Sequence, residues 1–265
     1  MLEIKNLTKI FNRDLSHSEW RVALDNVSIT INDGDFITVI GGNGSGKSTL
    51  MNSISGVFPL DEGQILIDSV DITSMPEHER AKFLGRVFQD PRMGTCSNMS
   101  ILENLELSVR RGKKRTLRWG FTKENETKYV ELLKGLDLGL EDRLSQKVGL
   151  LSGGQRQAVT LLMATLKTPK LLLLDEHTAA LDPKTAQTVL NLTNEIVTRE
   201  NITTLMITHN MSDAIKYGNR LIMLDHGHII FDISGEEKQK LTIKDLLDKF
   251  NESNVVADDS LYLSK

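Results

Sequence analysis

The apolar positions near the N-terminus follow the twofold period of β-strands. Val27, Ile29 and Ile31 alternate with polar residues, as in a strand with one buried face. A turn at Asp33–Gly34 separates them from FITVI (36–40), a short run that predicts a strand buried on both faces. The chain is therefore predicted to begin with β-structure.

The following segments alternate between helix and strand. A glycine-rich loop comes after residue 40, and a helix is predicted from about Lys47 to near Gly56. GQILID then predicts a short strand, a helical stretch opens at Pro76, and RVFQ predicts another strand. Such alternation is typical of α/β proteins.

Residues 91–150 differ in pattern and are predicted to form an inserted helical subdomain. Ser100 and Glu103 match a capping box at the start of one helix. Apolar residues at one-face helical spacing between 129 and 136 indicate a second helix. The basic run RRGKKRTLR (110–118) is either a solvated linker between these helices or a contact for lipid headgroups or an acidic partner.

After Gly154, helix and buried strand alternate again. LLLLD (171–175) and TTLMITH (203–209) are apolar runs joined by one long helix, which favours parallel strands with a crossover helix. A hairpin is predicted with its turn at His226–Gly227. The last helix is predicted to carry four apolar residues on one face: Ile243, Leu246, Leu247 and Phe250.

Composition and charge exclude several classes of protein. Of the 265 residues 39% are hydrophobic and 26% charged, as in ordinary globular proteins. The formal charge is 32 − 36 = −4, so no global positive field attracts nucleic acid or an anionic membrane. Cys96 is the single cysteine, which excludes an internal disulfide. With no signal-peptide core and no apolar run near the ~18 residues of a membrane span, we expect a cytosolic protein.

The segment GGNGSGKS indicates phosphate-binding chemistry. It fits G-x-x-x-x-G-K-[ST], the P-loop, with Gly41, Gly46, Lys47 and Ser48 at the fixed positions. The glycines let backbone N–H groups surround phosphates, Lys47 is placed to reach the β- and γ-phosphates, and the Ser48 hydroxyl to bind Mg²⁺. A glycine turn without a ligand is the alternative, but both flanking elements match the P-loop context.

Two acidic residues, Asp175 and Glu176, follow the predicted buried strand LLLL. Ligands of open α/β sheets bind at the carboxyl ends of the strands, and two carboxylates there require a cation nearby. Asp175 is expected to hold the metal of Mg·ATP, directly or through water, and Glu176 to orient or deprotonate the attacking water. Two solvated acids at a strand end are the alternative interpretation.

A second candidate cradle for an anion occurs in LSGGQRQ (151–157). Ser152 and Gln155 match a capping box, so one interpretation is simply the start of a helix. Gly153 and Gly154 argue against that interpretation, because glycine is a poor helix former and a cap does not require it. Close approach of a ligand to the backbone does require it.

The order of the motifs identifies a family. The P-loop is followed by a glutamine at a strand end (VFQD), then by LSGGQRQ, LLLLDE, ALD and ITHN. This series resembles the ATP-binding cassette (ABC) ATPases from about Leu2 to Ile233. The resemblance implies a P-loop NTPase (RecA-like) α/β core with an N-terminal antiparallel β-subdomain and an inserted α-helical signature subdomain. The ABC ATPase domain is expected at 1–235, its helical subdomain at 91–150, and a C-terminal helical tail at 236–265.

By this resemblance two cassettes pack head to tail as a dimer. Each ATP lies between the P-loop of one chain and the signature loop of the other, so the second cradle serves the partner's nucleotide. The expected ATP-binding residues are Gly41, Gly42, Asn43, Gly44, Ser45, Gly46, Lys47, Ser48 and Thr49 in the P-loop, Ser152, Gly153, Gly154 and Gln155 in the signature loop, and Asp182 and Phe11.

The resemblance also assigns the residues of hydrolysis. Gln89 resembles the glutamine that touches Mg²⁺ and the water, and a polar strand end is the alternative. His209 resembles the switch histidine at the γ-phosphate, and an ordinary loop histidine is the alternative. The expected catalytic residues are Glu176, His209, Gln89 and Lys47, and the expected metal-site residues are Ser48, Gln89 and Asp175.

Three further positions have more than one interpretation. Asp182 before Pro183 is an N-cap with proline at N1, and by resemblance it is also a residue of the D-loop across the dimer. By resemblance, Phe11 best matches the aromatic residue that stacks on adenine, and a core role for Phe11 is the alternative. The insertion NRDLSHSEW follows Phe11 and ends at Trp20, which is therefore a rival for the stacking role. His177 stands where many relatives have proline and leaves the acids untouched.

The resemblance implies an ATPase that powers transport. A single cassette without a membrane span fits an energy-coupling subunit at the cytoplasmic face of the membrane, bound to a separate integral membrane permease. The signature and DEHTAALDP segments look most like bacterial importers fed by a solute-binding protein, and an amino-acid-like solute is expected. The alternative is a non-transport ATPase of the iron–sulfur cluster assembly type. No nucleic-acid partner is expected, because the chain has no basic face.

Overall fold

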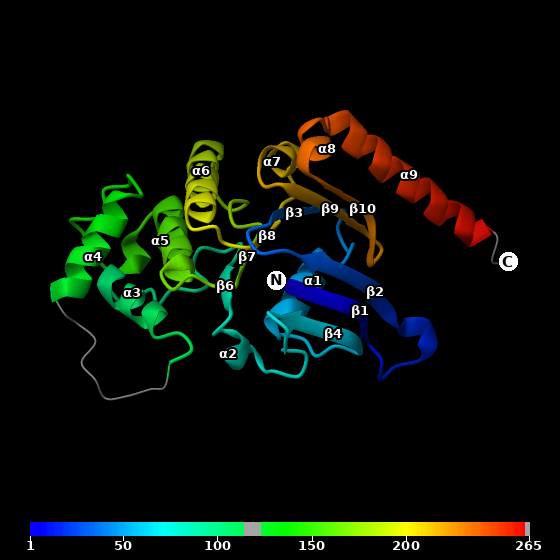
Figure 1. Cartoon of the computed structure of the whole chain (residues 1–265), viewed down its shortest axis with the longest axis horizontal. Coiled ribbons are helices and arrows are strands. Elements are labelled where there is room, and N and C mark those ends of the chain that lie inside the picture. Colours follow the sequence, from blue (N-terminus) through cyan, green and yellow to red (C-terminus); the bar gives the residue numbers. More distant parts are fainter. Residues whose placement is uncertain (114–122, 263–265) are drawn as a thin grey trace. The chain divides into compact units, whose positions relative to one another are not determined.

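The computed structural model describes residues 1–113 and 123–262 (Figure 1). These residues form two compact units, the first made of Met1–Glu77 and Thr203–Lys265 and the second of His78–Ile202. Part of the basic run at 110–118 lies outside the described residues. Within the described part, Arg111 donates to the carbonyl oxygens of Ala164 (3.2 Å) and Lys167 (2.7 Å), so this arginine is not simply solvated.

The first unit contains an antiparallel sheet with the strand order β2-β1-β4-β5. The predicted alternation is confirmed, since Val27, Ile29 and Ile31 on β2 are all buried. Their regular spacing places one apolar face of the sheet against the core of the unit. The strands are β1 (Leu2–Phe11), β2 (Arg21–Ile31), β4 (Glu62–Ile67) and β5 (Val70–Asp71).

The first unit also contains a group of mainly parallel strands. β3 pairs in parallel with β8 on one side and β9 on the other, and β9 pairs with β10 in the predicted antiparallel hairpin. All five residues of β3 are buried, as the FITVI pattern predicts for a strand covered on both faces. The strands are β3 (Phe36–Ile40), β8 (Thr204–Ile207), β9 (Arg220–Asp225) and β10 (His228–Ser234).

Helices of the first unit pack beside its mainly parallel strands: α7 contacts β3, α8 contacts β9 and β10, and α7 also contacts α8 and α9 (Figure 1). The prediction of one apolar face on the last helix is wrong for two residues. Leu246 is fully buried, but Ile243 and Leu247 are 46% and 44% exposed, so only part of this face is covered by the core of the unit. The helices are α1 (Lys47–Ser55), α7 (Met211–Lys216), α8 (Gly235–Gln239) and α9 (Ile243–Tyr262).

The second unit combines two parallel strands with a helical region, in which α3 packs on both α4 and α5 (Figure 1). The capping box at Ser100 and Glu103 is present, with both reciprocal hydrogen bonds. The elements are β6 (Leu84–Val87), β7 (Leu171–Asp175), α3 (Ile101–Val109), α4 (Lys123–Lys134), α5 (Gly153–Thr165) and α6 (Pro183–Arg199), and the short α2 (Glu77–Arg80) lies at the division between the units. In the part of the chain that the structure describes, no helix is both long and apolar enough to cross a bilayer.

Candidate nucleotide-binding site

The P-loop connects β3 to α1 in the first unit. Gly46 is the N-cap residue of α1, with φ +105°, a left-handed conformation that favours glycine. A Cβ atom at this position would also lie only 2.5 Å from the carbonyl oxygen of Ala23. No side-chain hydrogen bond caps the helix, and an N-terminus without such a cap is a favourable place for an anion. A phosphate fits this arrangement.

The Lys47 side chain is folded over the P-loop. Its Nζ atom donates to the carbonyl oxygens of Gly41 (2.9 Å) and Gly42 (2.8 Å) and lies 3.4 Å from Ser45 Oγ. Lys47 is 8% exposed, so a positive charge is held against the loop with little freedom to move. Together with the uncapped helix, this charge makes the loop complementary to an anion.

Two residues that no sequence pattern connects with this loop lie beside it. Arg21 on β2 places Nη2 3.4 Å from where a Cβ of Gly44 would be, and Phe250 on α9 lies near Gly42. Arg21 is also the register partner of Phe11 across β1 and β2. No local pattern indicates either contact, because both residues are distant from the loop in sequence.

The two candidates for stacking on adenine differ in their surroundings. Phe11, at the end of β1, makes an edge-to-face contact with Phe58, with ring centroids 5.3 Å apart. Trp20 donates its indole N–H to the carbonyl oxygen of Leu15 (3.3 Å), and the Arg13 guanidinium lies 5.6 Å from its ring centroid. Phe11 is half-buried and already part of an aromatic pair, and its role toward adenine stays a prediction.

Asp61 holds the end of β1 that carries Phe11. Its carboxylate accepts from Ile10 N (2.8 Å) and pairs with Lys9 (3.0 Å) and Arg13 (3.2 Å). Burial by itself raises the pKa of this carboxyl, but the donated hydrogen bonds and the lysine charge outweigh it and lower the pKa below its usual value. The charged form of Asp61 therefore fixes the backbone beside Phe11.

His209 is brought to the same edge of the strands as the P-loop. β3 leads into the P-loop and β8 leads to His209, and the two strands are parallel neighbours. A hydrogen bond from Thr208 N to Val39 O (3.1 Å) continues this pairing beyond β8. His209 is exposed, and Asn210 after it caps α7 by accepting from Ser212 N (2.9 Å). The first unit thus presents Lys47 and His209 at one edge.

In the second unit, Asp175 ends β7 and contacts an arginine. Arg86 Nη2 on the neighbouring strand β6 lies 3.3 Å from Asp175 Oδ2, and the Arg86 guanidinium carbon is 4.6 Å from the Phe88 ring centroid. The side chain of Arg86 is only 13% exposed and that of Asp175 only 20%. The sequence predicts a cation beside these acids, and the metal is the cation that it predicts. Arg86 is an additional cation, and the pairing of β6 with β7 brings it there.

Glu176 has an unusual backbone conformation. Its φ is +44°, in the left-handed region that costs free energy for a residue with a Cβ atom. The carbonyl oxygen of Glu176 accepts from Ala179 N (2.9 Å), which stabilises this turn directly after β7. Strained residues cluster at functional sites, so this conformation agrees with the predicted role of the carboxylate.

Gln89 follows β6 at the same edge as the end of β7, because the two strands are parallel neighbours. The strand ends at Val87, two residues earlier than the RVFQ pattern suggests, and Gln89 is exposed. Gln157 on α5 donates to the carbonyl oxygen of Phe88 (3.0 Å), which fixes the segment just before Gln89. The second unit thus gathers Gln89, Asp175 and Glu176 at one edge.

The signature loop forms the predicted capping box. Gln155 N donates to Ser152 Oγ (3.3 Å), and Ser152 N donates to Gln155 Oε1 (3.2 Å). Gly154 also has a packing reason that the sequence analysis did not consider, since a Cβ atom there would come 2.0 Å from Thr185 Cγ2 on α6. Ser152 and Gly153 remain exposed. Close helix packing thus accounts for one glycine, and the exposed pair stays available to a ligand.

Asp182 and His177 lie on either side of the turn before α6. Asp182 accepts from Thr185 N (3.1 Å) as the predicted N-cap, and the Thr185 hydrogen bonds lower its pKa. His177 is 2% exposed, its Nε2 lies 3.1 Å from Thr193 Oγ1, and burial lowers its pKa to about 4. His177 is therefore neutral at physiological pH and packs as part of the core.

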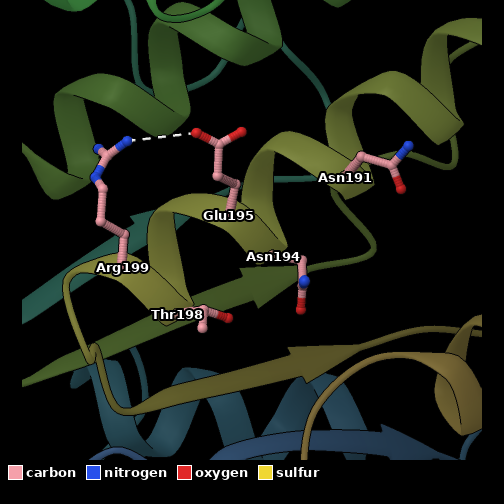
Figure 2. A pocket seen from close by; sticks show the side chains of 5 residues that line it. All are labelled: Asn191, Asn194, Glu195, Thr198 and Arg199. Atoms are coloured by element: carbon pink, nitrogen blue, oxygen red, sulfur yellow. Dashed lines mark ion pairs between the residues drawn. The ribbon is translucent and has the colours of Figure 1, made fainter.

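A surface depression of about 550 Å³ lies apart from all these residues (Figure 2). Its lining comes from α6 alone and includes an ion pair between Arg199 and Glu195 at 3.5 Å. It contains none of the predicted nucleotide-binding residues. The lining residues are Asn191, Asn194, Glu195, Thr198 and Arg199.

Comparison with known proteins identifies the family. Residues 24–179 match the family model described as ABC transporter. A tyrosine transport ATP-binding protein of Clostridioides difficile (strain R20291) is 49% identical over 255 residues, which cover 94% of this chain and 98% of the relative. A phosphonates import ATP-binding protein of Trichormus variabilis (strain ATCC 29413 / PCC 7937) is 33% identical over 241 residues, covering 90% and 95%.

Solved structures agree with this assignment. The ADP conformation of the ATP-binding cassette MJ1267 has a TM-score of 0.75 and 31% identity, covering 100% of this chain and 99% of that one. A dimeric post-hydrolysis state of the cassette MJ0796 bound to ADP and Pi has a TM-score of 0.73 and 29% identity, covering 88% and 98%. With its P-loop, signature loop and acidic strand end, the chain therefore belongs to the ATP-binding cassette family of transport ATPases, and the predicted P-loop NTPase fold is confirmed.

Proposed function

We propose that this chain is the subunit of an importer that hydrolyses Mg·ATP to drive uptake of an amino-acid-like solute. One observation carries the ATP chemistry: Lys47 is held over a P-loop whose helix α1 has no side-chain cap. The positive charge beside the N-terminus of the helix makes such a loop complementary to an anion. Membership of the ABC transporter family makes nucleotide phosphates the appropriate anion.

The metal-site proposal rests on the chemistry of the donor set. Ser48, Gln89 and Asp175 offer hydroxyl, amide and carboxylate oxygens, the ligands that Mg²⁺ prefers. When bound, Mg²⁺ would neutralise charge on the phosphate oxygens. Asp175 is held on one side by Arg86, which limits the rotation of its carboxylate.

The roles in hydrolysis are divided among four residues. Lys47 binds the β- and γ-phosphates, and Gln89 and His209 orient the water and the γ-phosphate. Glu176 accepts the proton of the attacking water as a general base. Its left-handed backbone determines where the carboxylate starts from the end of β7, which supports a positioning requirement at this residue.

Two chains are proposed to share two nucleotides. In each chain the exposed Ser152 and Gly153, at the N-terminus of α5, would face the phosphates bound by the P-loop of the other chain. Asp182 would contact the partner from the turn before α6. The dimeric MJ0796 cassette bound to ADP and Pi supports such an arrangement. In a closed twofold dimer, both signature loops are used at once.

The transport role is supported by the names of the relatives. The relative at 49% identity is named for tyrosine transport, and others are named for import of phosphonates and methionine. We therefore propose an amino-acid-like solute, and aromatic amino acids are the first candidates. A separate membrane permease would hold the chain at the cytoplasmic face of the membrane, and a solute-binding protein would deliver the solute to that permease.

The test is uptake in a strain whose own copy of the gene is deleted. The strain receives the wild-type chain, Lys47→Ala, or Asn191→Ala on the exposed surface of α6 as a matched control. We expect labelled tyrosine or a related amino acid to accumulate with the wild type and the control but not with Lys47→Ala. Equal uptake of every candidate solute by all three strains would refute the transport role. A tagged pull-down from detergent-solubilised cells should also recover a polytopic membrane protein.

A further inference from the structure

The C-terminal helix α9 reaches the P-loop. Leu246 on α9 is fully buried in a cluster that includes Ile40, the last residue of β3 before the loop. Phe250, one turn further along α9, packs against the same cluster. A Cβ atom on Gly42 would lie 3.2 Å from Phe250 Cζ and 3.6 Å from Cε2, so the edge of the ring lies next to the position that a side chain of residue 42 would occupy.

The position of α9 is fixed by polar contacts at its start. Thr242 and Asp245 cap the helix, with Asp245 N donating to Thr242 Oγ1 (3.3 Å) and Thr242 N to Asp245 Oδ2 (2.8 Å). On α8, just before it, the buried Lys238 donates to the carbonyl oxygens of Tyr217 and Gly218, the latter at 2.9 Å. The ring of Phe250 is therefore presented to the loop by an anchored element.

Gly42 is a sensitive place for such a contact. Its carbonyl oxygen accepts from Lys47 Nζ (2.8 Å) and from Ser45 N (3.3 Å). A shift of residue 42 would therefore move the lysine that is proposed to bind phosphate. The ring faces Gly42 where a side chain would begin, whereas the carbonyl group of Gly42 is bonded to the lysine, so the ring and the lysine contact different parts of this residue.

We propose that Phe250 is a positioning residue for the P-loop: α9 braces the loop at Gly42, so that nucleotide affinity depends on the C-terminal segment of the chain. Without the ring, residues 41–43 would sample conformations in which the lysine is displaced. The apparent affinity is then the intrinsic affinity multiplied by the fraction of loops that remain competent to bind. The inference rests on the proposed function only through ATP binding at the P-loop.

The first test compares two substitutions on the same helix in the full-length chain. Phe250→Ala removes the ring, and Leu247→Ala removes an apolar side chain that is 44% exposed. Calorimetric titration should show the Kd for ATP rising about fivefold in Phe250→Ala, as expected if one loop in five stays competent. Leu247→Ala should bind like the wild type. An unchanged Kd in Phe250→Ala would overturn the proposal.

The second test is a double-mutant cycle with Gly42→Ala. With Phe250 present, the new methyl group meets the ring at 3.2 Å, so ATP binding should weaken. Among the described residues other than Gly42 and its two chain neighbours, only ring atoms of Phe250 lie within 4 Å of that methyl position. Gly42→Ala should therefore be nearly neutral in the Phe250→Ala background. An equal effect of Gly42→Ala in both backgrounds would show that the ring does not act through this glycine.

Two measurements separate positioning from loss of fold. The thermal midpoint without nucleotide reports folding, and a purely structural role would lower it while leaving the Kd unchanged. Phe250→Leu, which keeps apolar bulk, should restore most of the affinity, and a Kd as weak as that of Phe250→Ala would contradict the brace. Failure of the proposed function looks different, because a wild-type chain that binds ATP but supports no uptake refutes transport and leaves this inference standing.

Discussion

The buried histidine before α6 makes folding stability depend on pH. His177 is 2% exposed, and burial lowers its pKa to about 4, compared with about 6.5 in an unfolded chain. Between these values the unfolded chain binds a proton that the folded chain does not bind. The free energy of unfolding is therefore fully retained above pH 6.5 and falls as the pH drops through 6.5 toward 4.

The size of the effect follows from the two pKa values. The difference between a pKa of about 4 in the folded chain and about 6.5 in the unfolded chain corresponds to about 3 kcal/mol when the pH lies at or below the folded pKa. Between pH 7.5 and pH 5 the same linkage predicts a loss of about 2 kcal/mol from this residue alone. His177→Gln removes the titrating group and keeps a donor for Thr193 Oγ1, which lies 3.1 Å from the imidazole Nε2.

The assay is urea unfolding at several pH values between 5 and 7.5, with EDTA and without nucleotide. Other titrating groups contribute equally to both proteins and cancel when the slopes against pH are subtracted. His177→Gln should lose about 2 kcal/mol less than the wild type over this range. His78→Asn, at an exposed histidine, is the control for removing a histidine. Identical pH slopes in wild type and His177→Gln would refute the reasoning.

Three further substitutions test the two acidic residues and the packing of the signature helix. Glu176→Gln should still bind ATP and should accumulate as a dimer with Mg·ATP, as measured by size-exclusion chromatography. Its ATP turnover should be slowed about 100-fold or more, and normal hydrolysis would exclude Glu176 as the general base. Arg86→Met removes the ion pair that holds Asp175 and should raise the Kd for Mn²⁺ about tenfold, measured by electron paramagnetic resonance in the presence of ATP. Arg86→Lys should give an intermediate Kd. An unchanged Kd in Arg86→Met would show that Arg86 does not position Asp175. Gly154→Ala places a methyl group 2.0 Å from Thr185 Cγ2 and should lower the free energy of unfolding by about 1–3 kcal/mol. Adding Thr185→Ser, which removes Cγ2, should restore part of this loss. Full stability of Gly154→Ala would contradict the tight packing of α5 on α6.

The secondary structure was largely readable from local patterns. Strands such as β2 and β3 appear as alternating or continuous apolar runs because side chains alternate between the two faces of a sheet. Both capping boxes are also visible, because each joins residues only three positions apart. The last helix shows what local sequence patterns leave open. Its four apolar positions were expected on one face, yet Ile243 and Leu247 are exposed, since only tertiary packing decides which apolar residues are covered.

For the site, the sequence by itself determined the chemistry: the glycines and lysine of the P-loop, the acids after β7, and the order of motifs that identifies the family. These features are local, because a phosphate cradle is built from consecutive backbone N–H groups. Tertiary structure alone decided which side chains support them. Arg86 meets Asp175 through the pairing of β6 with β7, Thr185 accounts for Gly154, and Phe250 touches Gly42 across some two hundred residues of chain. Such contacts leave no pattern in one sequence, because they depend on which elements pack together.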